Sequence, residues 1–196
     1  MKSVNFEILR DGWPELAGLG GFAESYAHAD PASALVKLRL FAENLTKDIY
    51  RELQLPKPDL PTFVDLLKND AFIAITPKVV LDKLHALRMH GNKAAHGEPV
   101  SSQHALWLLK EAHDLARWMC VRYGKAKADQ LPAFQQPAIP GQVEERERRR
   151  VLEKLAAQEA QMDALLSELE EARSKATAAQ KEAAELKQLA SSAQAV

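Results

Sequence analysis

The stretch PASALVKLRLFAENLTKDI, residues 31–49, decides the fold class. Its apolar side chains recur at intervals of three and four residues, which places them on one face of an α-helix. Asp30 precedes this stretch as a natural N-cap, and Pro31 suits the first helical turn. We therefore expect one long helix whose buried face consists of Leu35, Leu38, Phe41, Ala42, Leu45 and Ile49.

Similar patterns on both sides of this stretch predict further helices. Two prolines, Pro56 and Pro58, end the long helix, and Gly91 interrupts a later helical pattern. Phe72, Ile73 and Ile75 have strand-like composition, but they lack a second strand to pair with, so we expect a buried turn there. The sequence predicts an all-α protein with about five helices near residues 11–29, 31–55, 60–67, 77–91 and 101–123.

The aromatic residues divide the chain. All three Trp, all three Tyr and five of the six Phe lie within the first 124 residues. We therefore assign residues 1–124 to a compact helical bundle that contains the core. Residues 125–142 include three prolines and form either a linker or an extended arm over the bundle, with Phe134 as its anchor.

Residues 143–196 contain neither proline nor aromatic residues, and their apolar residues follow a heptad repeat. This spacing is typical of a coiled-coil helix. The second half of the repeat is rich in alanine and buries little area, so we expect only weak self-association. The expected interface positions are Val151, Leu155, Met162, Leu165, Leu169, Ala172, Ala176, Ala179, Ala183, Leu186 and Ala190.

Charge and cysteine content narrow the function classes. The formal net charge is −1, and residues 143–196 contribute −2, from nine Lys/Arg against eleven Asp/Glu. Neither part has the positive excess of a non-specific phosphate-binding surface, so we expect DNA contact only through a larger complex. The single cysteine, Cys120, and the absence of a signal peptide or a membrane-spanning stretch in the sequence predict a cytoplasmic protein without membrane contact.

The least ordinary stretch is LRMHGNKAAHG, residues 87–97. Arg88, Asn92 and His96 are spaced four apart and lie on one helix face. Arg39 and Glu43 share the same spacing on the earlier long helix, and packing of the two helices would pair Glu43 with Arg88 and let Asn92 bridge towards His96.

This cluster has two interpretations. In the first, Arg88 and His96 bind and cleave an RNA phosphate, as in ribonucleases of the HEPN superfamily, although the seven residues between them exceed the usual spacing of that family. In the second, which we favour, Arg39, Glu43, Arg88, Gly91, Asn92 and His96 form a structural polar cluster or binding site. We assign no catalytic residue and no metal ligand, because the sequence has neither HExxH spacing nor a phosphate-binding loop.

Three elements together resemble a known family. They are the opening MKSVNFE with Trp13-Pro14-Glu15-Leu16, then Asp30-Pro31 leading into residues 34–43, and then Leu87-Arg88-x-x-Gly91-Asn92-x-Ala94-Ala95-His96. In this order they resemble the N-terminal helical module of the R subunit of type I restriction enzymes, in which a coiled-coil stretch follows.

The resemblance implies a non-catalytic interaction and assembly module in the defence against foreign DNA. The implied partners are other subunits or domains of a restriction–modification complex. The nuclease and the ATP- and Mg-dependent motor of such an R subunit are expected downstream of Val196, so this chain needs no cofactor of its own. Two alternatives stay open: a free-standing HEPN-like ribonuclease that acts as a dimer, and a helical adaptor unrelated to restriction.

Overall fold

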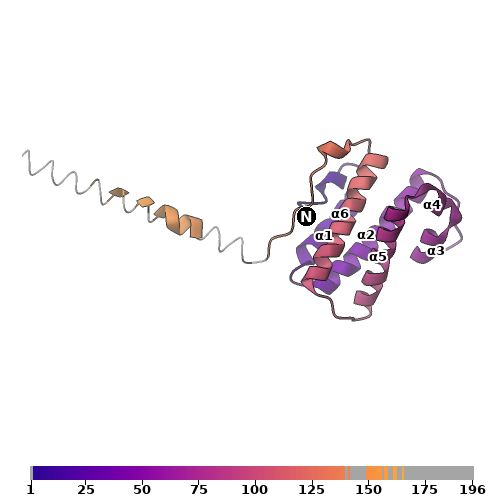
Figure 1. The fold of residues 1–196 in the computed structure, drawn as a ribbon, viewed down its shortest axis with the longest axis horizontal. Coiled ribbons are helices and arrows are strands. Elements are labelled where there is room, and N and C mark those ends of the chain that lie inside the picture. The colour runs from indigo at the N-terminus through magenta and orange to yellow at the C-terminus, as the bar shows by residue number, and fades with distance from the viewer. Residues whose placement is uncertain are drawn as a thin grey trace, which may run out of the picture. The chain divides into compact units, whose positions relative to one another are not determined.

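The computed structural model describes residues 2–139, 141, 149–155, 157–158, 161–162 and 165. The chain divides into two compact units, Met1–Pro140 and Gly141–Val196. Within the described residues every regular element is helical, which confirms the predicted fold class for this part of the chain (Figure 1). The first unit contains, in chain order, η1 (Glu7–Leu9), α1 (Pro14–Tyr26), α2 (Pro31–Glu52), α3 (Phe63–Lys68), α4 (Asp70–Ile75), α5 (Lys78–Ala95), α6 (Ser102–Arg122) and η2 (Ala128–Gln130).

Side-chain N-caps mark the start of two of the long helices, and the cap at Asp30 was predicted. The Asp30 carboxylate accepts a hydrogen bond from the backbone N–H of Ser33 at the start of α2. Ser101 Oγ accepts one from the backbone N–H of His104 at the start of α6. Each bond satisfies a backbone donor that the first helical turn leaves unpaired.

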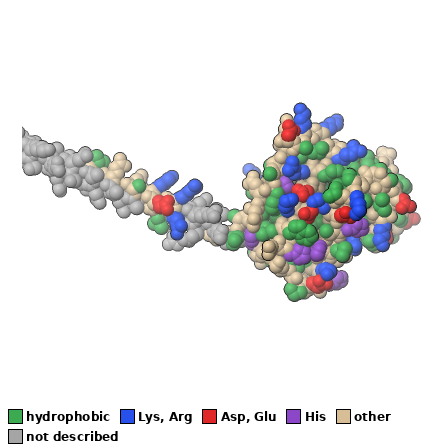
Figure 2. Space-filling model, viewed as in Figure 1, with side chains coloured by type: hydrophobic (Ala, Val, Ile, Leu, Met, Phe, Trp, Pro, Cys, Tyr) green, Lys and Arg blue, Asp and Glu red, His purple; other side chains and the backbone are tan. Residues whose placement is uncertain are grey.

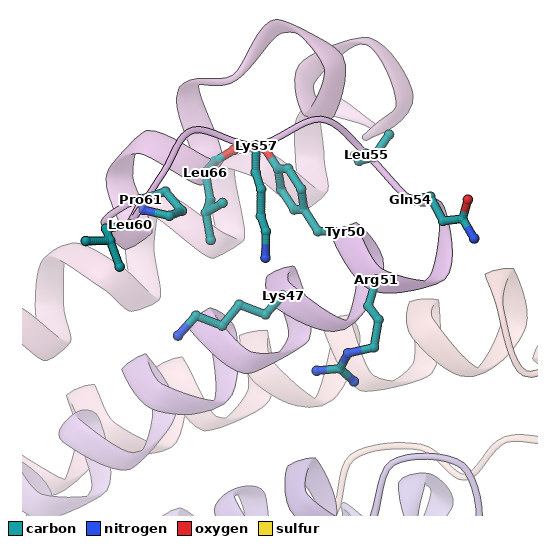
Figure 3. A pocket seen from close by; sticks show the side chains of 9 residues that line it. All are labelled: Lys47, Tyr50, Arg51, Gln54, Leu55, Lys57, Leu60, Pro61 and Leu66. Carbon is teal, nitrogen blue, oxygen red and sulfur yellow. Dashed lines mark hydrogen bonds between the residues drawn. The ribbon is translucent and has the colours of Figure 1, made fainter.

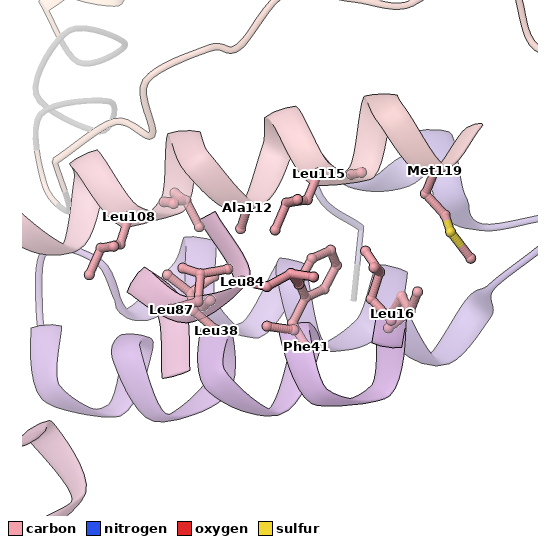
Figure 4. Close-up of a cluster of buried hydrophobic side chains, with 14 of the residues drawn as sticks. Leu16, Leu38, Phe41, Leu84, Leu87, Leu108, Ala112, Leu115 and Met119 are labelled. Carbon is pink, nitrogen blue, oxygen red and sulfur yellow. The ribbon is translucent and has the colours of Figure 1, made fainter. Parts of the chain in front are cut away.

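Helix α2 lies at the centre of the first unit and packs against α1, α5 and α6. All six residues expected on its buried face are at most 1% exposed. The core that they join has contributions from all four long helices, with Leu16 from α1, Leu84 from α5 and Leu108 from α6 among them (Figure 4). Lys83 also joins α5 to α6, because its Nζ contacts the carboxylates of Glu111 and Asp114.

The segment 70–75 corrects one expectation. Instead of a buried turn it forms α4, so the described residues of the first unit contain six α-helices. Asn69 caps this helix by accepting a hydrogen bond from the backbone N–H of Ala71. Phe72 is buried and stacks on Tyr50, whereas Ile73 is 46% exposed, so a single aromatic anchor holds the segment.

The segment after α6 crosses the surface of the first unit as an extended arm. Gln135 exchanges two hydrogen bonds with the buried Asn5 side chain, each 2.8 Å long. His28 Nε2 and the carbonyl oxygen of Pro137 form a further bond of 2.9 Å. Phe134, the expected anchor, packs beside His113 with 5.6 Å between ring centroids. The first compact unit accordingly extends to Pro140 and includes this arm.

Part of the predicted coiled coil falls on described residues. Residues 149–155 are helical, and so are the described positions as far as 165. Val151, Leu155, Met162 and Leu165 are each about half exposed. The other expected interface positions, from Leu169 to Ala190, lie outside the described residues, and pairing through this segment stays a prediction.

His113 is a buried titratable residue within the core. It is 1% exposed, and both of its ring nitrogens lack a hydrogen-bond partner in the described structure. Its ring lies between Phe6 and Phe134. Burial lowers the pKa of His113 below the ordinary value for histidine, and burial also lowers the pKa values of His85 and His90.

These lowered pKa values predict a loss of stability in mild acid. The unfolded chain binds protons at these histidines near pH 6.5, whereas the folded chain resists them, so stability is full above that pH and falls as the pH decreases towards the folded pKa values. His113→Leu removes one such group together with its two unpaired nitrogens. We expect its free energy of unfolding, measured by urea titration at pH 7.5 and 5.5, to decline less than that of the wild type. The control Met119→Leu changes a buried residue of α6 that does not titrate and should keep the wild-type decline, and equal declines in all three proteins would contradict this account.

Candidate functional site: an arginine groove between α2 and α5

The two helices that carry the predicted cluster meet at Gly91. A Cβ atom built on this glycine would lie 2.4 Å from Arg39 Cβ and 2.9 Å from the backbone oxygen of Leu35. Both distances are shorter than atoms tolerate, so only glycine lets α5 approach α2 this closely. This contact is the physical reason for a glycine inside a long helix, where it is otherwise unfavourable.

The helices run antiparallel. Gly91, near the end of α5, touches Leu35, near the start of α2. At the other end of α2, Tyr50 donates a hydrogen bond to Leu66 of α3, and α3 also contacts α5. One turn before Gly91, Arg88 is therefore level with the turn of α2 between Arg39 and Glu43. We call the surface formed by Arg39, Glu43, Arg88, Gly91 and Asn92 the arginine groove.

Glu43 pairs within its own helix. Its carboxylate lies 3.6 Å from Arg39 Nη2 and 2.8 Å from Lys47 Nζ. The expected ion pair with Arg88 is absent from the described residues. Two cations at intervals of four residues along α2 already balance the carboxylate, so removal of Arg88 would not leave Glu43 uncompensated.

The two arginines of the groove keep unused hydrogen-bond donors. Arg39 Nε and Arg88 Nε are both buried, and neither has a hydrogen-bond partner in the part of the chain that the structure describes. A buried donor without an acceptor is unfavourable, and most such groups in folded proteins are satisfied. Both side chains are partly exposed although their Nε atoms are buried, so a bound molecule reaches other atoms of these side chains.

The far end of the predicted cluster does not join the groove. His96 is exposed and caps the end of α5, where its backbone N–H bonds to the carbonyl oxygens of Asn92 and Lys93. The expected bridge from the Asn92 side chain to the His96 ring is absent from the described hydrogen bonds. Eight residues of helix rise about 12 Å, so Arg88 and His96 are well separated along α5.

The structure brings together another group that sequence analysis missed. His90 of α5 lies 4.5 Å from His104 of α6 between ring centroids, and Trp107 lies 5.8 Å from each of them. Trp107 is 48% exposed. Figure 2 shows several histidine side chains on the face of the helical unit that is in view. The sequence could have shown that His104 and Trp107, three residues apart, lie on one side of a helix. It could not have shown that His90 joins them, because this depends on the packing of α5 against α6.

The described residues contain neither a candidate metal-binding group nor a candidate membrane-spanning helix. No group of three or more His, Cys, Asp or Glu side chains there has the geometry to hold a metal ion. No helix among the described residues is long and apolar enough to cross a membrane. Cys120 is buried, and its Sγ lies 3.3 Å from the carbonyl oxygen of Ile8, where it helps to hold η1 on α6.

The described structure thus defines a helical domain in which four long helices surround one core and a pair of arginines occupies a tight groove between two of them. The chain belongs to the DUF4145 family, a domain of unknown function, whose family model matches residues 22–133. This range contains the whole arginine groove.

A curated relative gives a second similarity. Over 118 residues the chain is 30% identical to the type I restriction enzyme EcoKI endonuclease subunit of Escherichia coli strain K12. The match covers 60% of this chain but only 10% of the relative, so the chain spans about a tenth of that protein. No solved structure matches the chain.

The close contact at Gly91 predicts the effect of adding one methyl group. Gly91→Ala places a Cβ against Arg39 Cβ and a backbone oxygen, neither of which is the mobile end of a side chain. We expect a loss of about 1–3 kcal/mol in the free energy of unfolding, measured by urea titration. Gly18→Ala is the matched control, because a Cβ at this helical position meets nothing within 4 Å. It should stabilise the protein by about 0.5–1 kcal/mol, and the same sign of effect for both variants would refute the close-contact argument.

Proposed function

We propose that this chain is a non-catalytic interaction and assembly module of a restriction system, and that it binds another subunit through the arginine groove. The observation that carries the proposal is the 30% identity to a type I restriction enzyme endonuclease subunit, together with a family match that contains the groove. The nuclease and motor activities of such a system would belong to other parts of the assembly.

The groove has the properties expected of a protein-binding surface. Arginine is enriched among the residues that contribute most to binding energy, particularly where its side chain is already held in place. Arg39 is 33% exposed at its side chain, and the glycine contact fixes its Cβ. Its guanidinium group lies 3.6 Å from the Glu43 carboxylate, so it loses less freedom than an unpaired arginine when a partner accepts its hydrogen bonds.

Apolar surface beside the arginines supports the same proposal. Val36 and Leu40 are four residues apart on α2, which places them on one side of the helix, and each is 37% exposed. They flank Arg39 in the sequence. A partner that covers them gains hydrophobic contact while its acceptors meet Arg39 and Arg88, which is the usual combination of apolar and hydrogen-bonded contacts in an interface.

Binding measurements with the full chain test the proposal. The partners are the other subunits of the restriction–modification complex encoded in the same genome, and sedimentation velocity and calorimetry report complex formation. We expect a complex with wild-type chain and at least about tenfold weaker binding by Arg88→Gln, because tenfold corresponds to 1.4 kcal/mol and one charged hydrogen bond contributes about that much. Arg122→Gln, an exposed arginine at the end of α6, is the matched control and should bind like wild type.

The outcome also separates the rival interpretations. Failure of the wild-type chain to bind any of these subunits would contradict the proposal. RNA degradation by the purified chain that disappears in His96→Ala would instead favour the ribonuclease interpretation. Thermal unfolding of each variant shows whether a lost activity reflects a lost fold.

A further inference from the structure

A second surface lies at the C-terminal end of α2, beyond the arginine groove. The loop that follows α2 folds over the end of that helix and encloses, with α3, a pocket of about 580 Å³ (Figure 3). This volume is within the range of ordinary ligand sites, about 300–1,000 Å³. The lining residues are Lys47, Tyr50, Arg51, Gln54, Leu55, Lys57, Leu60, Pro61 and Leu66.

Three cationic side chains surround this pocket, and no acidic residue is among those that line it. Lys47 and Arg51 project from α2, four residues apart, and Lys57 extends from the loop towards them (Figure 3). Lys47 and Arg51 have one helical partner each, Glu43 and Asp48, both outside the lining. Lys57 forms no ion pair within the described residues. Like charges around one hollow repel each other, so an anion entering it is favoured electrostatically.

The rim of the pocket carries an unusual leucine. Leu60 is 98% exposed and has φ of +47°, a left-handed conformation that side chains other than glycine rarely adopt. Leu55, Pro61 and Leu66 supply further aliphatic lining. An occupant with an apolar side chain would remove Leu60 from water, so the pocket offers an aliphatic contact next to its cations.

The aromatic ring in the lining is already engaged. Tyr50 stacks on Phe72 with 5.3 Å between ring centroids, and its hydroxyl donates a hydrogen bond to the carbonyl oxygen of Leu66 at 2.8 Å. At 4% exposure it offers no free face for a nucleobase. Proteins that bind single-stranded nucleic acids commonly stack bases on aromatic side chains, so this lining favours an aliphatic anion over a nucleotide.

We propose that this pocket binds an acidic peptide segment of a partner protein, in which an apolar side chain is flanked by carboxylates. The apolar side chain packs against Leu60 and Pro61, and the carboxylates meet Lys47, Arg51 and Lys57. The pocket shares no residue with the arginine groove, so it constitutes a second binding surface whose existence does not depend on a restriction partner.

Fluorescence anisotropy with two labelled 12-residue peptides tests this proposal on the full chain. One peptide contains glutamates around leucines, and the other has glutamine at each glutamate. We expect the acidic peptide to bind at least tenfold more tightly, and its affinity to fall as NaCl is raised, because salt screens exposed charges. Lys57→Gln and Leu60→Ser should each weaken binding threefold or more.

Matched controls distinguish the pocket from general surface effects. Lys78→Gln makes the same charge change at an exposed lysine of α5, and Val79→Ser makes a similar apolar-to-polar change at a residue that is 60% exposed. Both should bind the acidic peptide like wild type. Equal binding of the two peptides, no binding of the acidic peptide, or equal losses in the controls would overturn the proposal. A single-stranded DNA oligonucleotide that binds in its place, with sensitivity to Lys57→Gln, would also overturn it. Because restriction subunits are absent from this assay, its result is separate from that of the arginine groove.

Discussion

The approach of α5 to α2 at Gly91 is the constraint on which the candidate site depends. Because the glycine has no side chain, the Arg39 stem and the Leu35 backbone fill the space that a Cβ would occupy. The same contact fixes the register of the two antiparallel helices and brings Arg88 level with Arg39. The groove is thus a consequence of core packing, and its arginines keep their position through backbone proximity rather than through an ion pair between the helices.

Sequence periodicity predicted most of the helices for a clear physical reason. Residues such as Leu38 and Phe41 must face a core, and Asp30 and Ser101 satisfy donors in the first turns of their helices. Segment 70–75 was misjudged because six residues are too few to display a helical period, and because the packing of Phe72 on Tyr50 joins residues that are distant in sequence. The type of local structure was predictable where many residues repeat a pattern, and not where one aromatic contact decides it.

Sequence spacing indicated residues of the candidate site, but it did not specify their contacts. Spacing placed Arg88 and Asn92 on one face of α5 and Arg39 on the earlier helix, and in the structure Arg39 lies against Gly91. Glu43 pairs with Arg39 and Lys47 of its own helix, and the sequence pattern alone did not show that it would pair with these rather than with Arg88. The pocket at the end of α2 was not foreseen, because it depends on the loop conformation that places Lys57 over the helix and leaves Leu60 exposed.

Net charge describes this chain poorly because its charges are distributed unevenly. The formal net charge is −1, yet the lining of the pocket contains three cations and no acid. With a screening length of about 8 Å at physiological ionic strength, a partner experiences the charges near its own contact surface and little of the distant remainder. A chain that is almost neutral overall therefore presents a positively charged pocket at the end of α2 and a partly exposed Arg39 side chain in the arginine groove. Both features suit recognition of acidic or carbonyl-bearing protein surfaces, for which local complementarity matters more than total charge.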